Sequence, residues 1–229
     1  MTDSAQGDIY LVRHGETPWS ITGQHTGRTV LALTPGGEAQ ARDLRARLRG
    51  RRFDHIFSSP LRRAVRTCEL AGFACVASLD SALLEWNYGN YEGRTSIQIR
   101  RERPGWELFR DGCPGGECVS QIAERVDRLV ARLRTLKGCV LLFSSGHLLR
   151  VLAARWLGET AQLGRGLELD PASVSVLGYA HHSGDSVIRL WNIHGGTPAA
   201  AGMDYDPRDR QRPSWNDLLG VKGTSRGPR

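Results

Sequence analysis

An arginine, a histidine and a glycine stand in a row directly after a short apolar run near the start of the chain. The run at residues 9–12 predicts a buried strand, and Arg13, His14 and Gly15 follow where that strand would end. Packing explains such a sequence poorly. An imidazole that titrates near neutral pH, a guanidinium and a glycine that lets an anion approach the backbone explain it better. We interpret His14 as a reactive imidazole beside a fixed cation, Arg13.

A second predicted strand, at 53–58, is followed by a helix at 61–71 that carries cations at its start. Arg62, Arg63 and Arg66 lie in its first two turns. A helix N-terminus offers free N–H groups and the positive end of the helix dipole, so arginines there predict an anion site. A solvated helix face explains Arg66, and one of Arg62 and Arg63, equally well.

A third junction follows the continuously apolar run at 139–143, which is typical of a central parallel strand. Polar residues including Ser145 come next, and a helix is predicted at 148–157. The carboxyl ends of neighbouring parallel strands meet at one edge of a sheet. We therefore expect the junctions at His14, Arg63 and Ser145 to converge.

Acidic and aromatic side chains alternate at residues 84–93, which contain Glu85 and Glu92. Large aromatic neighbours can desolvate a carboxyl group and raise its pKa, as a general acid requires. A rim of packed aromatics around a solvated glutamate accounts for the same sequence.

The remaining pattern supplies the scaffold. Thr34 and Pro35 predict a helix start, further helices are expected at 95–103 and 119–133, and an antiparallel hairpin is expected from 174–179 and 187–191. The segments 18–28 and 109–116 are expected to be loops. Strands that alternate with helices predict an α/β fold, here a three-layer α/β/α sandwich with a mostly parallel central sheet.

Composition bounds the domain organisation and the partners. The chain has 229 residues, of which 40% are hydrophobic, and a formal net charge of +7 carried almost entirely by arginine. We predict one catalytic domain at 1–195 and an extended or disordered basic tail at 196–229. No apolar run reaches the roughly 18 residues of a membrane span, and the acidic, polar N-terminus lacks a signal-peptide pattern, so we expect a cytoplasmic protein.

Five cysteines without a Cys-x-x-Cys motif are interpreted as free thiols, and no metal site or cofactor is expected. Arginine is suited to phosphate, but basic and aromatic residues are not interleaved as in nucleic-acid-binding proteins. We expect a small anionic substrate rather than a nucleic acid or a membrane, and a homodimer is compatible with the sequence.

In these residues the chain resembles the histidine phosphatase superfamily, also called the phosphoglycerate-mutase-like family, and the resemblance covers roughly residues 8–194. Residues 11–17, Leu-Val-Arg-His-Gly-Glu-Thr, match the specific signature of that family. Residues 59–64 look like its pattern Ser-Pro-Leu-x-Arg-Ala. The resemblance implies that Arg63 is the phosphate-clamping arginine and that Arg62 occupies the variable slot.

By the same resemblance, Glu85 is the proton donor and Glu92 is not. Thr26 lies where relatives often contact substrate, and we assign Gln24 and Tyr88 to the same role. Aromatic and basic side chains are expected to shape the substrate pocket, with a solvated helix face as the alternative for the arginines: Trp19, Trp86, Tyr88, Tyr91, Trp106, Arg100, Arg101 and Arg103.

One position departs from the family. Relatives carry a second catalytic histidine immediately before a glycine, and Ser145 stands there in this chain, followed by Gly146 and His147. We expect Ser145 to contact phosphate as a shorter, uncharged donor and hydrolysis to be impaired. The serine is either introduced to trap a ligand, natural in a slow or specialised enzyme, or compensated by His147. The last is disfavoured because adjacent turn positions point differently.

The resemblance implies that His14 attacks phosphorus to give phosphohistidine while Arg13 and Arg63 neutralise the phosphoryl oxygens. The expected activity is a phosphomonoesterase for a small phosphorylated metabolite, such as a sugar phosphate. A phosphoglycerate mutase is the enzyme alternative, disfavoured because mutases place an arginine where Trp86 follows Glu85. A non-catalytic phospho-ligand binding protein is the alternative that Ser145 suggests.

Overall fold

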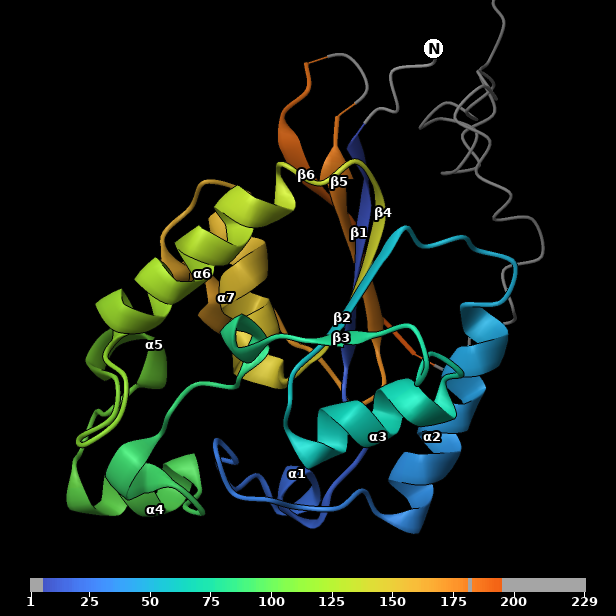
Figure 1. Cartoon of the computed structure of the whole chain (residues 1–229). Coiled ribbons are helices and arrows are strands. Elements are labelled where there is room, and N and C mark those ends of the chain that lie inside the picture. The colour runs from blue at the N-terminus through green and yellow to red at the C-terminus, as the bar shows by residue number, and fades with distance from the viewer. Residues whose placement is uncertain (1–5, 181–182, 195–229) are drawn as a thin grey trace, which may run out of the picture. The chain divides into compact units, whose positions relative to one another are not determined.

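The computed structural model describes residues 6–180 and 183–194, and these contain a six-stranded sheet (Figure 1). The strand order is β3-β2-β4-β1-β5-β6. The strands β3, β2, β4 and β1 run parallel, whereas β5 is antiparallel to β1 and β6 is antiparallel to β5. The strands are β1 (Gln6–Arg13), β2 (His55–Ser58), β3 (Ser78–Leu79), β4 (Gly138–Ser144), β5 (Val174–Tyr179) and β6 (Ser186–Ile193). The predicted mostly parallel sheet and the predicted hairpin are confirmed.

Helices cover both faces of this sheet because alternate side chains of its central strands form two separate apolar cores. Ile9 and Leu11 of β1 pack into the core shared with α6 (Val119–Leu133) and α7 (Gly146–Trp156). Tyr10 and Val12 pack on the opposite face, against α2 (Pro35–Arg47) and α3 (Arg62–Leu70). The period of two along β1 thus produces the three layers that Figure 1 shows, as predicted.

The register of the parallel strands aligns their carboxyl ends. Arg13 of β1 pairs with Ser144 of β4, and Ser58 of β2 pairs with Phe143 of β4. The backbone N–H of His14 donates to Ser144 O at 2.9 Å. The three predicted junctions therefore begin at the same edge of the sheet, as the sequence indicates.

Several local elements differ from the expectations. The expected loop at 18–28 contains α1 (Pro18–Thr22), because Thr17 caps it reciprocally with Ser20. Five further elements lie between the strands and helices already described. The helix α4 (Ser96–Glu102) was expected, whereas α5 (Leu108–Asp111) was expected to be loop. The others are the 3-10 helices η1 (Ser81–Leu83), η2 (Gly89–Tyr91) and η3 (Ala161–Gly166). The helix α7 begins two residues earlier than predicted.

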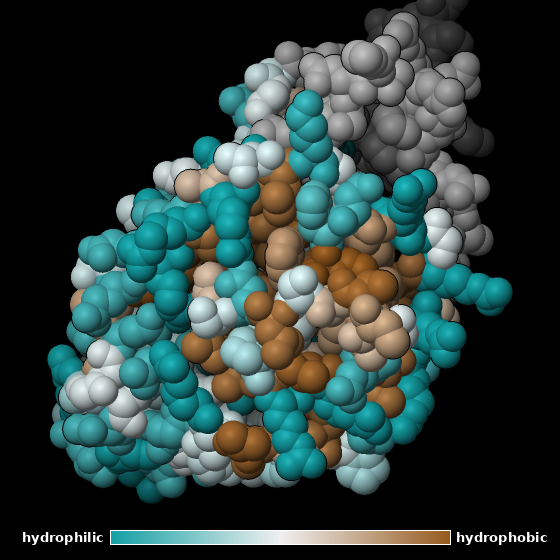
Figure 2. Space-filling model, in the orientation of Figure 1, coloured by the Kyte–Doolittle hydropathy of each residue, from teal (hydrophilic) through white to brown (hydrophobic). Residues whose placement is uncertain are grey.

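The edge strand β3 contains only two residues, because the chain turns just before it, where both Val76 N–H and Ala77 N–H donate to Phe73 O. Val76 and Leu79 are nevertheless exposed. On the face of the molecule that Figure 2 shows, apolar side chains lie near the middle, with hydrophilic side chains around them. The homodimer stays a prediction.

The predicted tail at 196–229 lies outside the described residues. Within the described part of the chain, none of the helices is both long and apolar enough to cross a membrane.

Candidate active site

His14 lies at the first position after β1 and is 4% exposed. Its Nδ1 lies 2.8 Å from Gly15 O. A carbonyl oxygen can only accept, so Nδ1 carries the proton and Nε2 keeps its lone pair. Burial, with the nearby charges of Arg63 and Arg13, lowers the pKa of His14 well below 6.5. The ring is therefore neutral at neutral pH, with Nε2 as a nucleophile.

Two buried arginines flank this ring. Arg63, which is 1% exposed, donates from Nη2 to Thr26 O at 2.8 Å and to Gly27 O at 2.9 Å. Arg13 donates from Nη1 to Leu169 O. The Nε atoms of both arginines are buried and have no hydrogen-bond partner in the described part of the chain. Buried donors without partners are uncommon, and two of them beside His14 indicate a site for a ligand rich in acceptor oxygens.

Glu85 follows η1 and is 4% exposed. Its Oε1 accepts from the backbone N–H of Trp86 and of Leu148, both at 2.8 Å, and its Oε2 accepts from His147 N–H at 3.0 Å. His147 and Leu148 belong to the first turn of α7, so Glu85 satisfies N–H groups that the N-cap residue normally binds. The carboxylate is held rigidly, on the side of the cavity where α7 begins.

Ser145 is the N-cap residue of α7, but its side chain makes no capping hydrogen bond. The hydroxyl Oγ instead accepts from Arg63 Nη2 at 3.3 Å, and Ser145 is fully buried. The structure thus brings Ser145 to the predicted junction, on the guanidinium of Arg63. Its contact with phosphate stays a prediction.

A cavity of about 250 Å³ opens over these groups. Its lining brings together His14, Arg13, Glu85, Thr26, Gln24 and Tyr88 of the predicted site, whereas Arg63 and Ser145 lie outside the lining. No group of three histidine, cysteine or acidic side chains suited to a metal ion occurs among the described residues.

The expected pocket aromatics divide into two groups. Trp19 and Tyr88 line the cavity. Trp86, Tyr91 and Trp106 do not, which corrects the expectation: all three are buried in the core beside α6 and α7. Trp86 Nε1 donates to Glu117 O and Trp106 Nε1 to Gly112 O, so their polar edges hold loops rather than substrate. The arginines at 100, 101 and 103 do not line the cavity either.

Glu92 holds the backbone of the loop that contains Gln24 and Thr26, two of the predicted substrate-binding residues. Its Oε1 accepts from Gly27 N–H at 2.8 Å and from Thr29 N–H at 3.1 Å. Gln24 Nε2 donates to Gly93 O at 2.7 Å, and Thr26 Oγ1 donates to Gln24 O at 3.3 Å. Glu92 therefore holds the backbone of this loop, and its carboxylate does not line the cavity.

Three ionisable residues of the cavity were not assigned to the site from the sequence: His25, His147 and Arg150. Ser145 and His147 point in different directions, as expected, yet His147 is the one that lines the cavity. Arg150 follows His147 by three positions, and i, i+3 spacing on a helix that starts at the strand edge was the signal for both. His25 is buried and stacks on Tyr88 at 4.8 Å, and burial lowers its pKa to about 4.

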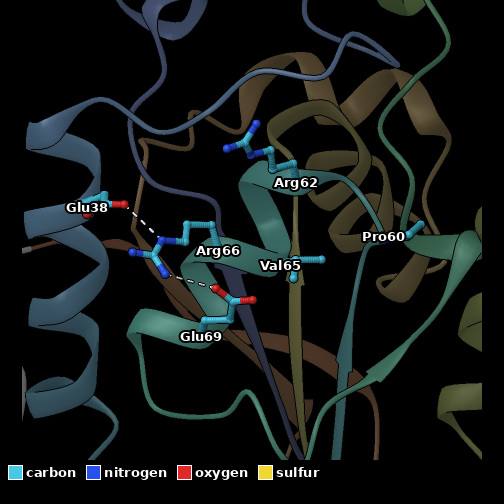
Figure 3. Close-up of a pocket in the computed structure, with 6 residues that line it drawn as sticks. All are labelled: Glu38, Pro60, Arg62, Val65, Arg66 and Glu69. Carbon is cyan, nitrogen blue, oxygen red and sulfur yellow. Dashed lines mark hydrogen bonds and ion pairs between the residues drawn. The ribbon is translucent and has the colours of Figure 1, made fainter.

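A larger, shallower depression of about 520 Å³ lies between α2 and α3 (Figure 3). Three of its four charged side chains are paired with one another, because Arg66 contacts Glu38 at 3.0 Å and Glu69 at 3.2 Å. No predicted catalytic side chain lines it. We place the active site in the smaller cavity, which His14, Arg13 and Glu85 line.

Comparison with known proteins identifies the family of the chain. The model of the histidine phosphatase superfamily (branch 1) matches residues 9–194. The chain is 39% identical over 178 residues to an acid phosphatase of Mycobacterium tuberculosis, covering 76% of this chain and 87% of that protein. It is 38% identical over 187 residues to a sedoheptulose 1,7-bisphosphatase of Saccharomyces cerevisiae, covering 66% of this chain and 68% of that protein.

A solved structure of an open reading frame product from Mycobacterium tuberculosis superposes with a TM-score of 0.79 and 35% identity, covering 83% of this chain and all of that one (100%). The family model and the relatives named as phosphatases define the class of this α/β sandwich, a histidine phosphatase. The chain belongs to the histidine phosphatase superfamily.

Proposed function

We propose that this phosphatase hydrolyses a small phosphomonoester, such as a sugar phosphate, through a phosphohistidine at His14. One observation carries the proposal: a neutral imidazole with a free Nε2 lies between two guanidinium groups whose Nε–H donors have no partner in the described chain. A phosphoryl group supplies both an electrophile for Nε2 and acceptors for the donors. The similarity to a sedoheptulose 1,7-bisphosphatase favours a sugar phosphate.

In the first half of the reaction, the lone pair of His14 Nε2 forms a bond to phosphorus, and the bond from phosphorus to the ester oxygen breaks. Glu85, in its protonated form, gives its proton to the departing alkoxide. Arg13 and Arg63 neutralise the phosphoryl oxygens throughout. In the second half, Glu85 takes a proton from water, whose oxygen attacks phosphorus. Inorganic phosphate leaves, and Nε2 regains its lone pair.

The position of Ser145 supports a reduced rate. Its hydroxyl oxygen accepts a hydrogen bond from Arg63. The side chain brings no charge, unlike the second histidine of relatives. A hydrogen bond to a charged group contributes roughly 1.5–3 kcal/mol, so its loss corresponds to a rate about 10- to 150-fold slower.

The test is release of inorganic phosphate from p-nitrophenyl phosphate and from a panel of sugar phosphates. We expect release by the unaltered protein, an acid-labile phosphohistidine on the His14 peptide by mass spectrometry, and loss of both in His14→Ala. The matched control is His55→Ala, which removes a histidine that binds Lys137 O and does not line the cavity. Equal phosphate release by His14→Ala and the unaltered protein would refute the proposal.

A further inference from the structure

Tyr88 and His147 form a short hydrogen bond at the wall of the cavity. The phenol oxygen of Tyr88 lies 2.6 Å from His147 Nδ1, and both residues line the cavity with His14. The two residues are far apart in the sequence. Tyr88 lies shortly after Glu85 in the aromatic and acidic stretch at 84–93, and His147 lies in the first turn of α7. The pair is thus made by the same packing that brings Glu85 to α7.

The direction of this hydrogen bond follows from the burial of both groups. Burial raises the pKa of Tyr88 well above 10, and the neighbouring carboxylate of Glu85 acts in the same direction. Burial lowers the pKa of His147 well below 6.5, as do the charges of Arg150, His25 and Arg13. Both groups are therefore neutral. Because the described residues offer the buried O–H of Tyr88 no acceptor other than His147 Nδ1, the phenol donates and the ring accepts at Nδ1. A neutral imidazole has one N–H, which must then be at Nε2.

Packing keeps the ring of His147 in place. Its ring centroid lies 5.5 Å from that of Phe109 and 5.9 Å from that of His25, and its backbone N–H is held by Glu85. Among the described residues, no protein atom hydrogen-bonds Nε2 of His147. The Nε2–H donor of His147 thus has no partner among the described residues, and it belongs to a side chain that lines the cavity.

We propose that Tyr88 holds His147 in the Nε2–H tautomer, so that this ring donates a hydrogen bond to an oxygen of the bound phosphoryl group. This inference rests on the proposed function. His147 thereby supplies, as a neutral donor, part of what Ser145 cannot supply from the place of the second histidine. Tyr88 acts as a positioning residue, because its O–H donor is used in the hydrogen bond to His147.

Two amide substitutions of His147 test the Nε2–H donor separately from the rest of the imidazole ring. The side-chain nitrogen of glutamine reaches about as far as Nε2, whereas that of asparagine reaches only as far as Nδ1. We expect His147→Gln to keep kcat/KM for p-nitrophenyl phosphate within about threefold, and His147→Asn to lose about 10- to 100-fold, the range for a hydrogen bond to a charged group. Equal losses in the two variants would overturn the inference.

The role of Tyr88 is tested by nitrogen-15 NMR of the His147 ring, which distinguishes protonated from unprotonated ring nitrogens. We expect an unprotonated Nδ1 and a protonated Nε2 in the unaltered protein, and a mixture of tautomers in Tyr88→Phe, with reduced kcat/KM. Tyr91→Phe is the matched control, since it removes a buried phenol from the same segment without touching the cavity. A protonated Nδ1 in the unaltered protein would refute the inference without any variant.

Binding of inorganic phosphate, measured by calorimetry, separates this inference from the proposed function. Weaker binding in His147→Asn but not in His147→Gln supports the phosphoryl contact even in the absence of turnover. Normal turnover through His14 together with phosphate binding that is the same in both variants would reject the contact and leave the proposed function standing.

Discussion

The guanidinium of Arg63 donates a hydrogen bond to the hydroxyl of Ser145 across 3.3 Å, in a region without solvent exposure of either side chain. The same Nη2 also binds two carbonyl oxygens of the loop at 26–29. The residue at position 145 therefore contacts the arginine that we propose as the phosphate clamp, and the same arginine holds the loop at 26–29.

Restoring a histidine at this position is expected to raise the rate. In Ser145→His, a second imidazole would face the phosphoryl group, and we expect turnover of p-nitrophenyl phosphate to rise by about tenfold or more. Ser145→Ala is the matched comparison, because it removes only the contact with Arg63. If Ser145→His has the same turnover as the unaltered protein while remaining folded, this position does not limit the reaction.

Arg63 and its neighbour in α3 are expected to differ sharply. Arg63→Ala removes a charge beside the transferred phosphoryl group, and we expect kcat/KM to fall by about 100- to 1,000-fold. Arg62 is exposed on the same helix, and Arg62→Ala is expected to leave the rate unchanged. Steady-state kinetics on both variants measure this difference, and similar losses would contradict the assignment of Arg63 as the clamp.

The acid role of Glu85 predicts a dependence on the leaving group. In Glu85→Gln, we expect hydrolysis of a sugar phosphate to fall by about 100- to 10,000-fold. The loss for p-nitrophenyl phosphate is expected to be much smaller, because p-nitrophenolate leaves without a proton.

Glu92→Gln is the control for that experiment, since Glu92 fastens the backbone of the loop at Gly27 and Thr29. Loosening the loop affects both substrates alike, so their rate ratio is expected to stay constant. A constant ratio in Glu85→Gln as well would show that Glu85 does not protonate the leaving group.

Three buried histidines predict that the protein loses stability in mild acid. The pKa values of His14 and His147 lie well below 6.5 and that of His25 is about 4, so below about pH 6.5 the unfolded chain binds protons that the folded chain does not. Stability is therefore full above pH 6.5 and falls as the pH drops toward the folded-state values. Each histidine contributes a slope of at most about 1.4 kcal/mol per pH unit.

Urea unfolding between pH 7.5 and pH 5.5 measures this slope in a range where carboxyl groups titrate little. We expect His25→Gln to reduce the slope by about one proton. A free energy of unfolding that stays constant or rises on acidification through this range would contradict the buried, neutral state of these rings.

Local pattern was sufficient wherever a segment's own periodicity dictates its structure. The apolar spacing at 119–133 predicts α6 with the bounds that the structure has, and the strand at 174–179 is likewise confirmed. The convergence of the three junctions also follows from the sequence, because a parallel sheet brings its carboxyl ends to one edge. The resemblance then selects His14, Arg63 and Glu85 from that edge.

Side-chain direction could not be predicted in the same way. Trp86, Tyr91 and Trp106 lie in the same aromatic segment or near it and pack only in the core, whereas Tyr88 belongs to the same core and also lines the cavity. These residues lie in irregular backbone and 3-10 turns, where no fixed period assigns a face.

The sequence by itself thus determined the fold class and the sheet edge at which the three junctions meet, and it named His14 as the proposed nucleophile beside Arg13. Only the tertiary structure decided that Glu85 holds the start of α7, that Ser145 lies on Arg63 and that His147 meets Tyr88 at the cavity wall. The physical reason is distance along the chain. Each of these contacts joins segments about 60 to 80 residues apart, and its geometry depends on how helices and loops pack against the finished sheet.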